Sequence, residues 1–371
     1  MKKKLLIACD SPNSFSGFST VTRNLFEPLS KEYDLYGFFV NYNPLIPIDN
    51  TIWTHHTQAK FESASPYNPQ LLATYAGFVK PDKVLMNNDF WVIAEWLNSL
   101  EGDGNYYLYF PVDSAMPVYE PFKKLIEPHK IIAYTEFQNK VLGRDDPVIS
   151  HGIDGKVWNK AVRINNYRKM FNLPEDKKII LLAGAHSHRK NHFTALKAIR
   201  ALQLERPGEF LALVHTRPVT TSFGPVSLYE LARLAGFDIT NADELLFSTT
   251  PLSQEFLPKL FSCADLYLSV SLGEGWGLMS PEIASLGVPC LLPDNTCVKE
   301  IMGDAAEYID VDSENLVAFP IDYNVRINIR WEDVLKSLRG FKPKINKAGY
   351  LLADKYRWND QVDKFLKVLD G

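Results

Sequence analysis

The chain has 371 residues, which is more than one ordinary core holds and suits two domains of roughly 150–200 residues each. Hydrophobic residues make up 46% and charged residues 23%, which excludes a disordered chain and allows sizeable apolar cores. The formal net charge of −4 excludes a protein covered in basic surface for non-specific nucleic-acid binding, but it leaves a local basic patch open.

The first part of the chain alternates short apolar runs with helical patterns. A polar, glycine-bearing loop over residues 11–19 follows the first run, and apolar residues then recur at helical spacing. We expect strands at residues 4–9, 33–40, 82–86, 106–110, 130–134 and 147–150, and a helix at residues 91–100. Continuous apolar strands with intervening helices predict a parallel, doubly wound sheet.

The same pattern restarts after a turn-rich boundary at residues 151–155. We expect strands at residues 178–183, 210–215, 244–248, 265–269 and 289–292, and helices at residues 193–204, 228–234, 254–263 and 282–286. The stretch 350–369 has the apolar spacing of an amphipathic helix. The sequence therefore predicts an α/β chain with domains over residues 1–158 and 159–349, followed by a C-terminal helix over 350–371.

Two doubly wound sheets also predict where a ligand binds. In open α/β sheets, ligands bind outside the carboxyl ends of the strands, so the loops that follow the strands are the candidate walls of a site. Two such domains that face each other would form a cleft, and we expect a small-molecule site in it.

The most informative segment covers residues 269–289 and has the pattern of a strand, a glycine loop and a helix start. Two of its glycines, Gly275 and Gly277, permit close backbone approach and a positive φ. Ser280 suits the N-cap and Pro281 the first helical position. The N–H groups of Gly277, Leu278 and the first helical turn would then form an anion site that fits a phosphate or diphosphate.

Two carboxylates, Glu274 and Glu282, frame this glycine loop. Carboxylates beside an anion site repel phosphate, so we expect them to contact another group. Sugar hydroxyls fit, because a carboxylate accepts paired hydrogen bonds from neighbouring hydroxyls. The alternative is that Glu282 only complements the helix dipole and that Glu274 is solvated.

The segment from Glu274 to Pro289, with seven residues between Glu274 and Glu282, resembles the signature of family 4 of the retaining glycosyltransferases. The resemblance is strong over residues 175–315 and thin over residues 1–150. It implies the GT-B fold, in which two Rossmann-like doubly wound domains face each other across a cleft and the C-terminal helix returns to the N-terminal domain. It also implies transfer of a sugar from a nucleotide diphosphate sugar to an acceptor hydroxyl, with retained anomeric configuration.

The resemblance implies a role for several residues on the donor side. Glu282 would bind the ribose hydroxyls, and Glu274 would lie beside the donor sugar as a catalytic group. Lys190 matches the lysine that neutralises the donor diphosphate, with Arg189 assisting it, and a Lys/Arg pair after a strand suits that task physically. The other donor-binding residues that the resemblance implies are Gly17 of the N-terminal glycine loop, Thr250 beside the nucleotide base, and Gly275, Trp276, Gly277 and Leu278 of the motif.

Two positions depart from the family pattern. Ala185 stands where many members carry an arginine, which affects the charge balance around the donor phosphates. Asp113 stands where members commonly carry a histidine, and an aspartate there would orient the acceptor hydroxyl or accept its proton. The alternative for Asp113 is a loop-capping aspartate.

No cofactor is expected, because a UDP- or GDP-sugar would be the substrate. His186, His188 and His192 lack the carboxylate or cysteine that would complete a zinc site, and we read the Asp-Val-Asp of residues 310–312 as linker. The acceptor stays open among a glycan, a lipid-linked sugar, a metabolite and a modified DNA base, and the oligomeric state is not predicted.

Two alternative functions remain open: a nucleotide-sugar epimerase of the same fold, and a catalytically inactive nucleotide-binding module.

Four scattered cysteines indicate buried thiols in a reducing compartment. The first apolar stretch is too short for a signal peptide, and no run approaches the ~20 apolar residues of a membrane span. We therefore expect a soluble, cytoplasmic protein.

Overall fold

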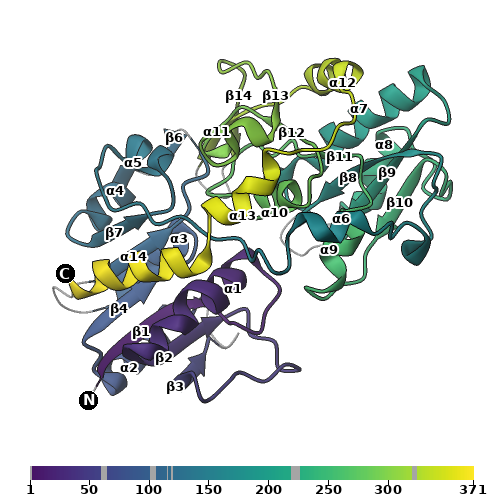
Figure 1. The fold of residues 1–371 in the computed structure, drawn as a ribbon. Coiled ribbons are helices and arrows are strands. Elements are labelled where there is room, and N and C mark those ends of the chain that lie inside the picture. Colours follow the sequence, from purple (N-terminus) through teal and green to yellow (C-terminus); the bar gives the residue numbers. More distant parts are fainter. Residues whose placement is uncertain are drawn as a thin grey trace. The chain divides into compact units, whose positions relative to one another are not determined.

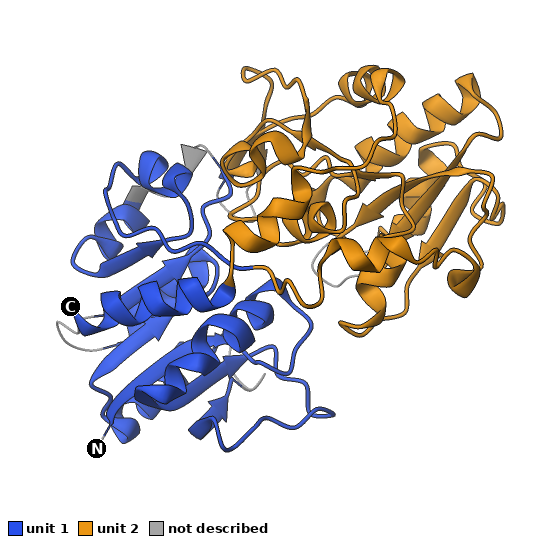
Figure 2. Cartoon of the chain, in the orientation of Figure 1, with its two compact units in different colours: residues 1–152, 320–324, 358–371 blue, residues 153–319, 325–357 orange. Residues whose placement is uncertain are grey.

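The structure is a computed structural model that describes residues 2–59, 65–100, 106–114, 116–117, 120–218, 226–319 and 324–371. The chain divides into two compact units (Figure 2). Unit 1 comprises residues 1–152, 320–324 and 358–371, and unit 2 comprises residues 153–319 and 325–357. The boundaries predicted from the sequence lie after residues 158 and 349.

Unit 1 is built on a parallel sheet with the strand order β3-β2-β1-β4-β5-β7. Its strands are β1 (Lys3–Asp10), β2 (Tyr33–Val40), β3 (Trp53–Gln58), β4 (Lys83–Met86), β5 (Tyr106–Phe110) and β7 (Lys130–Ala133). The central strand β1 is fully buried from Leu5 to Cys9, because helices cover both faces of a parallel sheet.

The helices of unit 1 come from both ends of the chain. They are α1 (Gly17–Val21), a π-helical turn (Thr22–Phe26), a 3₁₀ turn (Glu27–Lys31), α2 (Pro69–Val79), α3 (Phe90–Ser99), α4 (Glu120–Ile126), α5 (Glu136–Leu142) and α14 (Trp358–Asp370). A further short strand of this unit is β6 (Met116–Pro117). Figure 1 shows α14, the yellow end of the chain, beside the purple helical segment at residues 22–26, the π-helical turn that follows α1. Phe365 of α14 lies edge-on to Phe26 with ring centroids 5.8 Å apart, so the C-terminal helix is part of this unit's core.

Unit 2 repeats the arrangement with the strand order β10-β9-β8-β11-β12-β13. Its strands are β8 (Lys178–Ala183), β9 (Phe210–His215), β10 (Leu245–Ser248), β11 (Leu266–Leu268), β12 (Cys290–Pro293) and β13 (Glu307–Ile309), with β14 (Leu316–Phe319) beside β15 (Asn324–Ile327). Its helices are α6 (Lys160–Ile164), α7 (His192–Glu205), α8 (Leu228–Leu234), α9 (Phe256–Phe261), α10 (Met279–Ser285), α11 (Val298–Met302), α12 (Trp331–Gly340) and α13 (Leu352–Lys355).

Two parallel, doubly wound sheets confirm the α/β class that the sequence predicts, but two of the expected elements are wrong. Residues 147–150 form no strand, since only the isolated bridge between Ala133 and Val148 joins this stretch to the sheet. The expected helix over 350–369 is broken between α13 and α14. The break has a long-range cause, because the Tyr356 carbonyl is turned out to accept the N–H of Ile153 at 2.6 Å.

Candidate active site

The candidate site lies at the carboxyl edge of the sheet of unit 2. The strand order reverses between the neighbours β8 and β11, so the loops that follow these two strands leave the sheet in opposite directions and open a crevice between them. The loop after β8 ends in a 3₁₀ turn, His188–Lys190, and the loop after β11 carries the glycine motif at residues 273–278. The fold therefore brings together two segments that the sequence analysis had selected separately.

Glu274 and the two cations Lys190 and Arg189 form one ionic cluster at this crevice. Lys190 Nζ lies 2.5 Å from Glu274 Oε1, and Arg189 Nη1 lies 3.0 Å from Glu274 Oε2. Only 11% of the Glu274 side chain is exposed. Burial by itself would raise the pKa of Glu274, but the charges and hydrogen bonds of Lys190 and Arg189 outweigh it and lower this pKa to about 2. Glu274 is therefore ionised at neutral pH.

Hydrogen bonds to main-chain carbonyls join the two loops beneath the cluster. The N–H of Leu272 donates to the carbonyl of Arg189 at 2.8 Å, and the Arg189 guanidinium also donates to the carbonyl of Gly273. Gly184, at the exit from β8, has φ +125°, a conformation that L side chains rarely adopt, and it turns the chain beside the Lys190 stem. These contacts hold the guanidinium and the ammonium in place before any ligand arrives.

A third segment, Asn295-Thr296-Cys297 after β12, supports the Glu274 loop. The Asn295 amide donates to the carbonyl of Ser271 at 3.0 Å, the Thr296 hydroxyl accepts the N–H of Glu274 at 3.1 Å, and the Cys297 thiol donates to the carbonyl of Glu274 at 3.0 Å. Thr296 has φ +47°, which is strained for a β-branched residue.

This segment is not among the site residues predicted from the sequence. Its signal was the polar pair Asn295-Thr296 directly after a buried strand, β12, which neighbours β11 in the sheet.

The glycine loop has the positive φ that was expected at Gly277, at +79°. A Cβ there would lie 3.3 Å from Glu274 Cγ, so the glycine makes room for the carboxylate. The N–H groups of Gly277 and Leu278 are half-buried and donate to no described residue, which leaves them available to an anion.

The expected helix start at Ser280 and Pro281 is wrong. Helix α10 begins at Met279, and its N-cap is Leu278, whose φ and ψ of −41° and −44° are already helical. The positive φ of Gly277 turns the chain into the helix early, and the N–H of Ser280 then donates to the carbonyl of Gly277 at 3.2 Å. Ser280 therefore lies inside the helix rather than capping it.

Glu282 lies in the first turn of α10, half-buried and ready to accept hydrogen bonds. No described residue donates a hydrogen bond to its carboxyl group. Burial, followed by the negative charge of Asp154, raises the pKa of Glu282 to about 8. The two carboxyl groups of the motif therefore differ in protonation at neutral pH, because cations surround only Glu274.

The other donor-side residues lie in different environments. Trp276 is buried with its ring edge-on to Tyr356 at 5.4 Å, so its side chain belongs to the core of the unit. Thr250 is exposed in the turn after β10, and Gly275 is buried within the motif. Gly17, the exposed first residue of α1, belongs to unit 1. The structure therefore groups Glu274, Lys190, Arg189 and Gly277 and does not place Gly17 relative to them.

Asp113, the candidate acceptor-side residue, follows β5 in unit 1 and is half-buried. It lines a small, mostly apolar cavity whose walls include Phe90, Phe110 and Phe122. Phe110 and Phe122 lie edge-on with ring centroids 5.5 Å apart. The position at the carboxyl end of a strand is the one expected of a residue that meets a ligand.

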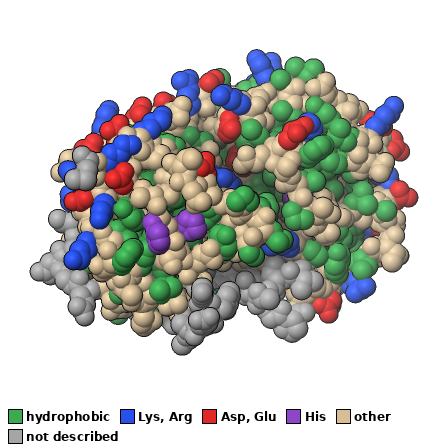
Figure 3. All heavy atoms as spheres, turned by 90° about the horizontal axis from the view of Figure 1, so that it is seen from below, with side chains coloured by type: hydrophobic (Ala, Val, Ile, Leu, Met, Phe, Trp, Pro, Cys, Tyr) green, Lys and Arg blue, Asp and Glu red, His purple; other side chains and the backbone are tan. Residues whose placement is uncertain are grey.

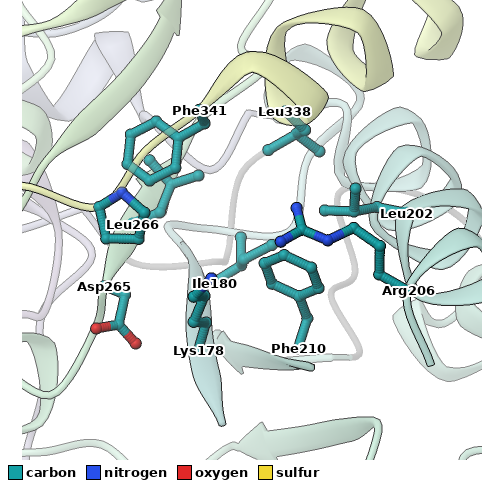
Figure 4. Close-up of a pocket in the computed structure, with 10 residues that line it drawn as sticks. Lys178, Ile180, Leu202, Arg206, Phe210, Asp265, Leu266, Leu338 and Phe341 are labelled. Atoms are coloured by element: carbon teal, nitrogen blue, oxygen red, sulfur yellow. The ribbon is translucent and has the colours of Figure 1, made fainter. Parts of the chain in front are cut away.

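A second cavity, in unit 2, lies away from the candidate site. Figure 4 shows Lys178, Phe210 and Asp265 among its lining residues. These residues start or directly precede β8, β9 and β11, so the cavity is at the amino ends of the strands. Its place at the edge opposite to the glycine motif separates it from the chemistry described above.

His192, close to Lys190, adds no positive charge to the cluster at neutral pH. The rings of His186 and His192 lie 6.0 Å apart, and burial, with smaller contributions from His186 and Lys190, lowers the pKa of His192 to about 3. Within the part of the chain that the structure describes, no three His, Cys, Asp or Glu side chains gather as a metal site.

On the face seen in Figure 3, Lys and Arg side chains are interspersed with Asp and Glu side chains rather than gathered into one basic surface. None of the described helices is both long and apolar enough to cross a membrane.

Residues 163–318 match the family model of the glycosyl transferases group 1. This stretch contains Lys190, Arg189 and both carboxylates of the motif, and the match confirms the resemblance that the sequence showed over residues 175–315. No curated protein matches the chain in sequence.

Solved structures with the same fold cover the whole chain. A sucrose-phosphate synthase from Thermosynechococcus elongatus is 12% identical, with a TM-score of 0.73, over 100% of this chain and 98% of that one. Anabaena HepE in complex with UDP-glucose is 11% identical, with a TM-score of 0.72, over 99% of both chains. An E. coli trehalose-6-phosphate structure bound with UDP-2-fluoro glucose is 13% identical, with a TM-score of 0.70, over 99% of this chain and 98% of that one. The chain thus has the GT-B glycosyltransferase fold and carries a glycosyl transferases group 1 domain at residues 163–318.

Proposed function

We propose that the protein transfers a sugar from a UDP- or GDP-sugar to an acceptor hydroxyl, with retention of the anomeric configuration and without an obligatory metal ion. The observation that carries the proposal is the ionic cluster of Glu274, Lys190 and Arg189 at the switch point of a group 1 domain. The UDP-glucose and UDP-2-fluoro glucose bound in two proteins of the same fold support a nucleotide sugar as donor.

In this proposal the donor diphosphate binds to Lys190, Arg189 and the N–H groups of Gly277 and Leu278. Without ligand, Glu274 compensates the two cations, which would otherwise repel each other at this half-buried place. When the diphosphate arrives, it shares these cations, and Glu274 turns its remaining acceptor capacity to the sugar hydroxyls. The same carboxylate thus holds the two cations in place and accepts hydrogen bonds from the sugar.

The rest of the donor binds to groups at the same edge of the sheet. Glu282 binds the ribose hydroxyls. Thr250, in the turn after β10, borders the nucleotide base, and the backbone of Gly275 and Trp276 lines the donor site. Two residues of unit 1 complete the assignment that the resemblance implies: Gly17 for the donor phosphate and Asp113 for the acceptor hydroxyl.

The chemical step follows from these placements. The bond between the anomeric carbon and the diphosphate oxygen breaks through an oxocarbenium-like transition state, and the acceptor oxygen bonds to the same face of that carbon. The acceptor proton passes to the leaving phosphate oxygen, so no enzyme nucleophile is required. Lys190 contributes most where negative charge develops on the leaving diphosphate.

The test is a donor screen that measures released nucleotide diphosphate by mass spectrometry, with the candidate acceptors supplied in turn: glycan, lipid-linked sugar, metabolite and modified DNA. The expected result is release of UDP or GDP by the wild type and its loss in Glu274→Gln. A donor that is rearranged without any acceptor would indicate an epimerase, and tight nucleotide binding without turnover would indicate an inactive module. Either outcome would refute the proposal.

The cytoplasmic location stays a prediction.

A further inference from the structure

Unit 1 has a switch point of its own, and a buried carboxylate lies there. The strand order of its sheet reverses between β1 and β4, and β1 ends at Asp10. Asp10 is 1% exposed and forms no ion pair with a described Lys or Arg. Burial raises its pKa, although three neighbouring side chains offset part of that effect.

The Asp10 carboxylate joins the ends of three strands and one loop. Its Oδ1 accepts hydrogen bonds from the amides of Asn41, at 3.1 Å, and Asn88, at 3.3 Å, which follow β2 and β4. Its Oδ2 accepts the hydroxyl of Ser16. Asn41 reaches it from a left-handed backbone with φ +54°, so the chain adopts an uncommon conformation at this contact.

Ser16 connects the carboxylate to the glycine-bearing loop. Its hydroxyl oxygen caps α1 by accepting the N–H of Ser19 at 3.0 Å, and the next residue is Gly17. The Ser19 hydroxyl in turn donates to the carbonyl of Ser11 at 2.8 Å, which closes the loop on itself. The direction of the chain at Gly17 therefore depends on a hydroxyl that Asp10 holds.

A buried carboxylate without a cation is costly, and a neutral side chain could tie the same strands together at lower cost. The feature specific to a carboxylate is that all its lone pairs accept, so it can hold two amides and one hydroxyl at once in fixed orientation. An asparagine would turn one of these acceptors into a donor that faces the Ser16 hydroxyl or an amide.

We propose that Asp10 is a positioning residue that acts through Ser16 to set the turn at Gly17. The proposal rests on the proposed function, which places this turn beside the donor phosphate and the acceptor. In the variants Asp10→Asn and Ser16→Ala the turn is misplaced, and a misplacement of about 1 Å near the reacting groups lowers kcat roughly 10- to 100-fold.

The experiment measures kcat, KM and thermal stability for Asp10→Asn, Ser16→Ala and the double variant. The matched control is Glu27→Gln, because Glu27 is another carboxyl group of unit 1 whose pKa burial raises and which accepts a hydrogen bond, from Trp53 Nε1 at 3.0 Å. We expect each single variant to lose kcat, the double variant to lose no more than the worse single one, and Glu27→Gln to keep kcat whatever its stability.

Wild-type kcat in both single variants, or losses that multiply in the double variant, would overturn the role of Asp10. If the wild type itself shows no transfer, the proposed function fails. Amide hydrogen exchange across residues 11–21 then tests whether Asp10 positions the loop. Exchange that is faster in Asp10→Asn than in Glu27→Gln supports the positioning role, and equal exchange refutes it.

Discussion

The ammonium of Lys190 and the carboxylate of Glu274 lie 2.5 Å apart across the switch point of unit 2. The group proposed for the diphosphate and the group proposed for the sugar are therefore one electrostatic unit. A ligand that binds here has to share this ion pair, and a substitution of either partner changes the charge state and position of the other.

Lys190→Ala should abolish most of the activity. It removes a cation that stabilises the charge developing on the leaving diphosphate, and losing one such group costs about 10²- to 10³-fold in kcat. The control is Lys259→Ala, which breaks a surface pair with Glu255 whose atoms lie 2.8 Å apart. Released nucleotide diphosphate is the measurement. A folded Lys190→Ala protein with wild-type turnover would refute the assigned role.

Glu274 should make stability sensitive to acid. Its folded-state pKa of about 2 lies below the ordinary value of 4.5, so its contribution to stability is complete above pH 4.5 and is lost as the pH falls toward 2. Denaturant unfolding of wild type and Glu274→Gln should therefore differ most near neutral pH, and the difference should shrink toward pH 2. A difference that does not depend on pH would show that the ion pairs do not form in solution.

Several parts of the fold were predictable because burial leaves a strong pattern in sequence. The expected strands 33–40, 106–110, 178–183 and 210–215 agree with β2, β5, β8 and β9, which are mostly apolar and mostly buried. Strand β3 was not predicted, because Trp53–Gln58 lies at the edge of the sheet and is mostly polar. The break between α13 and α14 depends on a hydrogen bond from Ile153, about two hundred residues away, which no local pattern encodes.

The candidate site was predictable as residues but not as contacts. The glycine loop, both carboxylates and the Lys/Arg pair each have a local signature, whereas the ion pair joins positions separated by 84 residues. The start of α10 was misplaced because Gly277 sets the backbone of Leu278 and so overrides the capping preference of Ser280. The support from Asn295-Thr296-Cys297 depends on the order of strands, which becomes visible only when the sheet is formed.

Glu282 should change the pH dependence of stability in the opposite direction to Glu274. Its folded-state pKa of about 8 lies above the ordinary 4.5, so the folded protein retains a proton that the unfolded chain releases, and stability falls as the pH rises from 4.5 to 8. Glu282→Gln should therefore be more stable than wild type at pH 8 and equal to it below pH 4.5.

The same variant should bind nucleotide less tightly, by about 10-fold, because the amide replaces one of the two carboxyl oxygens with an NH2 group and a hydrogen bond to the ribose is lost. Titration calorimetry with UDP and GDP measures this loss. Asp154→Asn is the matched variant, since it removes the second cause of the raised pKa and should lower the pKa of Glu282. A Glu282→Gln protein that binds both nucleotides as tightly as wild type would exclude Glu282 from the ribose site.

Thr296→Val should damage the site while keeping the branched shape of the side chain. The valine cannot accept the N–H of Glu274, which then loses its partner at a cost of about 1–3 kcal/mol. Thr296→Ser keeps the acceptor and should retain both stability and turnover. If the valine variant matched the serine variant in both measurements, the hydroxyl would have no part in holding Glu274.

Gly277→Ala should reduce both stability and activity, and the chain contains a matched control for the backbone effect. Gly277 has φ +79°, and Gly208 of the same unit has φ +78°. An alanine at either position incurs the left-handed penalty of about 1–2 kcal/mol. At Gly208 a Cβ meets nothing within 4 Å, whereas at Gly277 it lies 3.3 Å from Glu274 Cγ.

The two alanine variants therefore separate conformational strain from displacement of the carboxylate. We expect Gly208→Ala to lower the free energy of unfolding and to keep wild-type turnover. Gly277→Ala should be destabilised at least as much and should also lose turnover, because the added methyl group pushes Glu274 away from Lys190 and Arg189. Denaturant unfolding and released nucleotide diphosphate give the two readouts. Equal turnover in the two variants would mean that the position of Glu274 does not limit the reaction, which removes the carboxylate from the chemical step.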